Sequence, residues 1–101
     1  MDINRSIREA TEVIRLQGRF DYQVRSAFQQ TVKSAVENTS ASEIQIDLGG
    51  VNHVDSSALG MLILLRIDAE SAGKTVVLTR ATERVMGTLR IANFESFFNF
   101  K

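Results

Sequence analysis

The sequence predicts a single α/β domain with a sheet that is at least partly parallel. Its length of 101 residues is typical of one domain. Short apolar strand patterns alternate with helical patterns in the order β-β-α-β-α-β-α-β, which gives five strands. Proline is absent and only six glycines occur, so no linker, repeat or low-complexity segment divides the chain. We therefore expect one compact domain over residues 1–101.

The first part of the chain predicts a hairpin followed by a helix. Ile14 and Leu16 alternate with polar residues in "EVIRLQ", as on a half-buried strand. The weaker strand pattern of Ile3–Arg8 would pair with it through a turn near Ala10, and "GRFD" then interrupts the alternation. Asp21 stands where a carboxylate can cap the first turn of a helix. One helical stripe follows, formed by the apolar positions 24, 27, 28, 32, 35 and 36.

The middle of the chain predicts a strand and a strongly apolar helix. Glu43–Leu48 alternates as a strand, and Gly49–Gly50 predicts a turn after it. Ser56–Ala72 is apolar nearly all round, which is typical of a helix buried on most of its faces. Gly73 suits the position just past the end of that helix.

The last part predicts a buried strand, a helix and a closing strand, at Thr75–Thr79, Thr82–Ala92 and Phe97–Phe100. Four of the six phenylalanines lie within the last eight residues. Packing in the core is the favoured interpretation, because phenylalanine is mostly buried. The alternative is an exposed aromatic edge that a partner covers.

Composition excludes several functional classes. Twelve basic and twelve acidic residues cancel, which gives no electrostatic reason to expect nucleic acid or an anionic membrane surface. The chain has no cysteine and one histidine, so we expect neither a disulfide nor a metal site, and no cofactor. The longest apolar run, Ala58–Leu65, is far shorter than the roughly 20 residues of a membrane span. The N-terminus lacks the apolar core of a signal peptide, so we expect a cytoplasmic protein.

The stretch "VDSSALG" at the start of the apolar helix allows three interpretations. Asp and Ser are preferred helix caps, and Ser57 is the better placed of the two serines for that role. A nucleophilic serine is disfavoured, because Gly-x-Ser-x-Gly is absent and the only histidine, His53, lies in the same segment. A phosphorylation site is the third. A phosphate on Ser56 would meet the positive end of the helix dipole, although Asp55 would repel it.

Three stretches together resemble the STAS-domain family of bacterial anti-sigma-factor antagonists. They are "IRLQGRFD", "IQIDLGGVNHVDSSALGMLILL" and "GKTVVLTRATERVMGTLRIANFESFFNF", which span nearly the whole chain. The central stretch is the specific one, because it combines an alternating strand, the Asp-Ser-Ser loop and an apolar helix. The resemblance implies a mixed sheet of about five strands with helices packed mainly on one side.

The resemblance also implies a binding function without catalysis. The unphosphorylated antagonist binds an anti-sigma factor with serine-kinase activity and so frees a sigma factor. The kinase phosphorylates the serine after the Asp, here Ser56, which releases the partner, and a serine phosphatase resets the cycle. Asp55 and Asp21 match the two acids of the family, and Ser57 matches its second hydroxyl, so these four residues form the implied partner-binding surface. Ala58 departs from the family pattern, which commonly has glycine there.

An alternative function remains open within the same family. Some relatives are accessory subunits of an ABC-type lipid transport system and bind its ATPase without a kinase. Others form the cytoplasmic tail of an anion transporter, which the missing membrane span disfavours.

Overall fold

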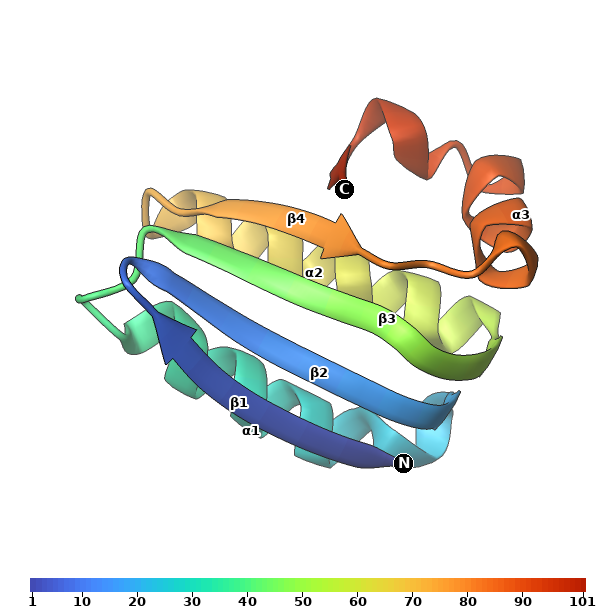
Figure 1. The fold of residues 1–101 in the computed structure, drawn as a ribbon, viewed down its shortest axis with the longest axis horizontal. Helices are drawn as coiled ribbons and strands as arrows, with labels where there is room; N and C mark the ends of the chain where they lie inside the picture. The colour runs from blue at the N-terminus through green and yellow to red at the C-terminus, as the bar shows by residue number, and fades with distance from the viewer.

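The computed structural model describes residues 1–101 and contains one five-stranded sheet in the order β1-β2-β3-β4-β5 (Figure 1). β1 is antiparallel to β2, and the other neighbours are parallel. The predicted mixed α/β fold is therefore confirmed. The strands are β1 Asp2–Arg8, β2 Thr11–Phe20, β3 Glu43–Val54, β4 Thr75–Thr79 and β5 Asn99–Phe100, and the helices are α1 Arg25–Glu37, α2 Ser56–Ser71 and α3 Glu83–Ile91. None of these helices has the length and apolar character needed to cross a membrane.

The predicted hairpin is present, but its second strand is longer than expected. β1 and β2 turn at Glu9 and Ala10, with Glu9 in the left-handed region at φ 56°. The expectation that "GRFD" ends the strand is wrong, because β2 continues to Phe20. Gly18 allows this at φ 106°, where a side chain would be strained. The longer β2 carries Asp21 to the edge of the sheet.

The turn predicted at Gly49–Gly50 is also wrong, because β3 continues through both glycines to Val54. The pairing passes from Arg15↔Asp47 to Gln17↔Gly50, so β3 has one extra residue there, as in a β-bulge. A Cβ on Gly50 would lie 2.7 Å from the side chain of Gln17. Glycine therefore serves a close approach between two strands, and β3 ends at Val54, directly before Asp55.

The core lies between the sheet and the layer formed by α1 and α2, which run side by side on one face (Figure 1). The predicted stripe of α1 is confirmed, with Phe28, Val32 and Ala35 buried. A 3₁₀ turn at Tyr22–Val24 precedes that helix. The ring of Phe28 packs against Phe20 of β2 at 5.0 Å between centroids. The strands and α1 therefore share one apolar interior.

The expectation that α2 is buried on most faces is wrong. Its inner side is buried, but Ile63, Leu64 and Ile67 are 39%, 53% and 51% exposed. These three residues lie on the side of α2 that faces away from the sheet, and no further layer packs on it. We call them the outer stripe.

The C-terminal phenylalanines divide between core and surface. Phe94 and Phe98 are buried and stack at 5.1 Å between centroids, whereas Phe97 is 43% exposed. The closing strand covers only Asn99–Phe100, because a 3₁₀ turn at Phe94–Ser96 takes up part of the segment. Core packing is thus confirmed for two of the rings.

Candidate functional site

The register of the parallel strands brings the two predicted acids together. Phe20 at the end of β2 is opposite Val54 at the end of β3, and each is followed by an aspartate. The backbone N–H of Asp55 donates to the carbonyl oxygen of Phe20 at 3.4 Å. Asp21 and Asp55 therefore lie at the same edge of the sheet, beside the start of α2.

Asp55, and not Ser57, caps α2. Its Oδ1 accepts a hydrogen bond from the backbone N–H of Ala58 at 2.9 Å, with Asp55 in an extended conformation. The prediction for Ser57 is wrong because the helix begins at Ser56, so that Ser57 already lies inside the first turn. The carboxylate before the helix is the group that reaches the free N–H.

Ser56 is consequently presented without a structural role. It occupies the first position of α2 and is exposed, whereas Ser57 is half-buried. The first N–H groups of a helix have no partner within the helix, and Asp55 takes only that of Ala58. The N–H groups of Ser56 and Ser57, with the positive end of the helix dipole, therefore remain available to an anion.

Asp21 is fixed in a similar way at the end of β2. Its Oδ1 accepts from the backbone N–H of Gln23 at 3.0 Å, which caps the 3₁₀ turn before α1. Its Oδ2 lies 3.5 Å from Nε of Arg19. Asp21 therefore caps the 3₁₀ turn, whereas α1 itself begins after Val24 without a side-chain cap, so the cap predicted at Asp21 is confirmed only for the turn before that helix. Both acids are held by backbone N–H groups next to Ser56.

An apolar hollow beside Ser57 was not predicted. We call it the Tyr22 hollow; it measures about 430 Å³ and is lined by Tyr22, Arg25, Gln29, Ser57, Gly60, Met61, Ile63 and Leu64. The guanidinium of Arg25 lies 4.0 Å from the ring centroid of Tyr22, a cation–π contact. The apolar residues of α2 that line this hollow are present in the sequence pattern, but periodicity alone predicts that they lie in the core.

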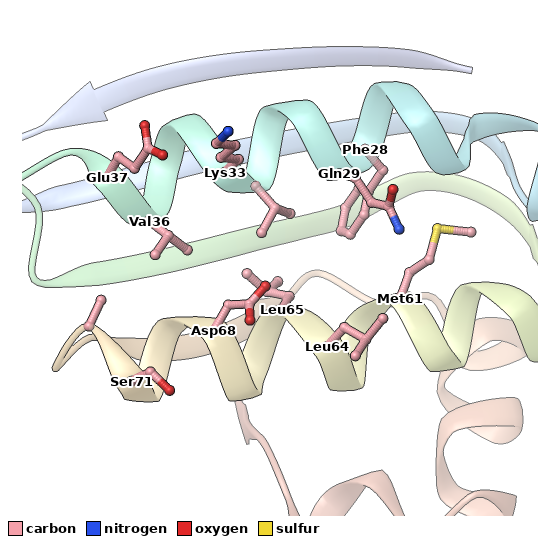
Figure 2. A pocket seen from close by; sticks show the side chains of 12 residues that line it. Phe28, Gln29, Lys33, Val36, Glu37, Met61, Leu64, Leu65, Asp68 and Ser71 are labelled. Atoms are coloured by element: carbon pink, nitrogen blue, oxygen red, sulfur yellow. The ribbon is translucent and has the colours of Figure 1, made fainter.

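A second depression, which we call the helix groove, runs between α1 and α2 (Figure 2). It measures about 550 Å³ and has apolar walls that include Phe28, Val32 and Leu65. It shares Gln29, Met61 and Leu64 with the Tyr22 hollow, so the two are continuous. An apolar surface therefore extends along the helix layer from the first turn of α2.

His53 lies in β3, opposite Arg19 of β2, and is half-buried. It lies in a strand because β3 continues past the glycines to Val54.

Comparison with known proteins identifies the family. The family model described as "Mlab, STAS domain" matches residues 3–98. A STAS-domain containing protein of Pseudomonas aeruginosa (strain UCBPP-PA14) is 34% identical over 85 residues, which cover 84% of this chain and 82% of the relative. The chain belongs to the STAS-domain family.

Solved structures show the same fold. A putative anti-sigma factor antagonist from Thermotoga maritima has a TM-score of 0.87 and 18% identity, over 97% of this chain and 84% of the other. The anti-sigma factor antagonist SpoIIAA in its unphosphorylated form has a TM-score of 0.79 and 18% identity, over 99% and 87%. SpoIIAA of Bacillus in its phosphorylated form gives 0.75 and 15%, over 99% and 91%.

Proposed function

We propose that this STAS domain is an anti-sigma-factor antagonist that is switched by phosphorylation of Ser56. The unphosphorylated chain binds an anti-sigma factor with serine-kinase activity and frees a sigma factor. Phosphorylation releases the partner, and a serine phosphatase restores the binding form. The observation that carries the proposal is that Ser56 is exposed at the first position of α2 while Asp55 makes the cap.

The chain supplies the phosphoryl acceptor, and the kinase supplies ATP and the catalytic groups. Oγ of Ser56 forms a bond to the γ-phosphorus as the bond to ADP breaks, and the hydroxyl proton passes to a base of the kinase. Ser56 is exposed in the first turn of α2, where a kinase can reach its hydroxyl. This chain therefore needs no catalytic group of its own, which agrees with its role as a binding protein.

Release follows from the charges around Ser56. A phosphate adds about −1.5 to −2 at pH 7, beside the carboxylates of Asp21 and Asp55. The helix N-terminus stabilises it in the free chain. In an interface without water, unpaired charge of this size costs several kcal/mol, which is enough to release a partner. The cap does not involve Ser56, so the phosphate changes the surface and leaves the helix intact.

Two observations support the proposal. SpoIIAA shares the fold and occurs in unphosphorylated and phosphorylated forms, and SpoIIAA is an anti-sigma factor antagonist. The Tyr22 hollow gives the surface beside Ser57 the apolar character of a protein interface.

That same hollow favours a second candidate, an accessory subunit that binds the ATPase of an ABC-type lipid transport system. An apolar docking surface requires no phosphoryl group, so this function needs no modification of Ser56. The two candidates differ in the effect of Ser56→Asp. The antagonist loses affinity for its partner relative to Ser56→Ala, whereas the accessory subunit retains it.

The direct test is phosphoryl transfer with the cognate serine kinase and [γ-³²P]ATP. The wild-type chain and Ser57→Ala should be labelled, and Ser56→Ala should not. Mass spectrometry of the labelled peptide locates the phosphate. Full labelling of Ser56→Ala, or a phosphate on Ser57, would contradict the assignment.

A further inference from the structure

The exposed apolar side chains of the helix layer are gathered in one place. Ile63, Leu64 and Ile67 of the outer stripe are 39–53% exposed, and Tyr22 is 58% exposed. Tyr22, Ile63 and Leu64 all line the Tyr22 hollow, and Ile67 lies one turn beyond Ile63. Scattered apolar residues on a surface need no explanation, but a contiguous patch marks an interaction surface.

The helix groove has the dimensions of a short helix. Its walls run from Phe28 to Glu37 on α1 and from Met61 to Ala72 on α2. At 1.5 Å per residue these segments span about 14–17 Å, the length of roughly three helical turns. Two parallel ridges with an apolar floor between them form the shape that accepts an amphipathic helix through residues at i, i+3/i+4 and i+7. Figure 2 shows Phe28 and Val36 of α1 and Met61 and Leu65 of α2 pointing towards the space between the two helices.

Charged groups without partners are distributed unequally along this surface. Lys33, Glu37 and Asp68 flank the helix groove, and none of them forms a salt bridge within the chain. At the other end, Arg25 lines the Tyr22 hollow, and its buried Nη1 has no hydrogen-bond partner. Among the lining residues, the Tyr22 hollow therefore carries one cation, Arg25, and the helix groove carries two carboxylates against one ammonium.

We infer that the Tyr22 hollow and the helix groove together bind one amphipathic helix of a protein partner. Its apolar face packs on Leu64 and the groove floor. A carboxylate near one end of this helix pairs with the guanidinium of Arg25, and basic side chains near the other end pair with Glu37 and Asp68. The inference rests on the proposed function in assigning this helix to the anti-sigma factor.

In this arrangement, the apolar surface supplies the affinity for the helix, and phosphorylation of Ser56 regulates it. The apolar surface supplies most of the contact, and Ser56 lies beside one end of it, next to Ser57 of the hollow. A phosphate there changes the charge at the end where the helix brings its carboxylate. Repulsion between the two anions then weakens a contact that the groove alone would keep.

Two synthetic peptides test the charge pairing without the natural partner. Both are 14-residue, acetylated and amidated helices with leucines at i, i+4, i+7 and i+11; one has glutamates at one end and lysines at the other, and the control has glutamines at all of these charged positions. Fluorescence anisotropy with labelled peptides should show that the charged peptide binds at least about tenfold more tightly than the glutamine peptide, since tenfold corresponds to about 1.4 kcal/mol. Asp68→Lys should reduce that ratio.

Matched substitutions locate the binding surface. Leu64→Ser removes an exposed apolar residue from the groove and should weaken the better peptide about tenfold, as expected for a central contact. Ile91→Ser removes an isoleucine of α3 that is 90% exposed, and it should leave the affinity unchanged. Circular dichroism verifies that both variants are folded.

Several results would overturn the inference. They are equal affinity of the two peptides, absence of binding by both, and equal effects of Leu64→Ser and Ile91→Ser. A wild-type dimer in sedimentation that Leu64→Ser dissociates would assign the surface to a second copy instead. A chain that is labelled on Ser56 but binds neither peptide would retain the proposed function and lose this inference.

Discussion

The two ends of the sheet differ in how their polar side chains are hydrogen-bonded. At the amino end of β2, the buried carboxylate of Glu12 is bonded to Arg5 at 2.8 and 3.0 Å and to Asn38 at 3.2 Å. At the carboxyl end, the carboxylates of Asp21 and Asp55 accept hydrogen bonds from the backbone N–H groups that they cap. The neighbouring Ser56 is exposed. At the first end, which we call the closed end, the polar side chains bond to one another. At the second, which we call the open end, the hydroxyl of Ser56 remains free.

The closed end joins elements that are distant in the sequence. Lys74, at the start of β4, is buried, and its Nζ donates to the carbonyl oxygen of Asn38 at 2.6 Å and to that of Ala41. Together with the Glu12 contacts, these bonds link both strands of the hairpin to the end of α1 and to β4. A saturated buried network fixes a fold, whereas an open polar edge can change its charge without disturbing that fold.

The largest expected effect is at the closed end. Arg5→Met leaves the buried carboxylate of Glu12 without its guanidinium and should lower the free energy of unfolding by about 1–3 kcal/mol. The matched control is Arg19→Met, which breaks the exposed pair with Asp21 and should cost less than about 0.5 kcal/mol. Urea denaturation measures both. Equal losses would remove the difference between the two ends.

The cap at the open end should contribute less. Asp55→Ala removes the acceptor of the Ala58 N–H and should cost about 1 kcal/mol. Ser56→Ala and Ser57→Ala should stay within about 0.5 kcal/mol of the wild type, because neither hydroxyl caps the helix. Thermal denaturation compares the three variants. A loss in Ser57→Ala as large as that in Asp55→Ala would restore Ser57 as the cap.

Acid should weaken the closed end specifically. Hydrogen bonding from Arg5 chiefly lowers the pKa of Glu12 below its ordinary value, against the desolvation that raises it. A lowered pKa stabilises the folded chain above the unfolded value, and this contribution disappears as the pH falls through the folded pKa. Glu12→Gln should therefore be less stable at pH 7 and lose less stability between pH 5 and 3. Parallel pH profiles for the variant and the wild type would contradict this.

The sequence predicted local features well where local physics decides them. Alternation in β2, the turn near Ala10 and Gly73 at φ 75° all depend on a few neighbouring residues. The turn predicted at Gly49–Gly50 is wrong because the role of the glycines depends on the adjacent strand, whose Gln17 lies close to the backbone of Gly50. No local pattern contains that information.

The site was only partly predictable for a related reason. Asp21, Asp55 and Ser56 were identified through the family resemblance, and the register of β2 and β3 explains why the two acids meet. The outer stripe was assigned to the core, because an apolar pattern shows which faces of a helix avoid water but not how many layers surround it. The exposure of Leu64 and Ile67 therefore becomes visible only in the structure.

The central claim is that a phosphate on Ser56 changes binding and not folding. The most direct measurement is calorimetric titration of the anti-sigma kinase, without ATP, with stoichiometrically phosphorylated and unphosphorylated chain. The phosphorylated chain should bind at least about tenfold more weakly, or 1.4 kcal/mol, with an unchanged circular dichroism spectrum. Equal Kd values, or loss of the helical spectrum on phosphorylation, would contradict it.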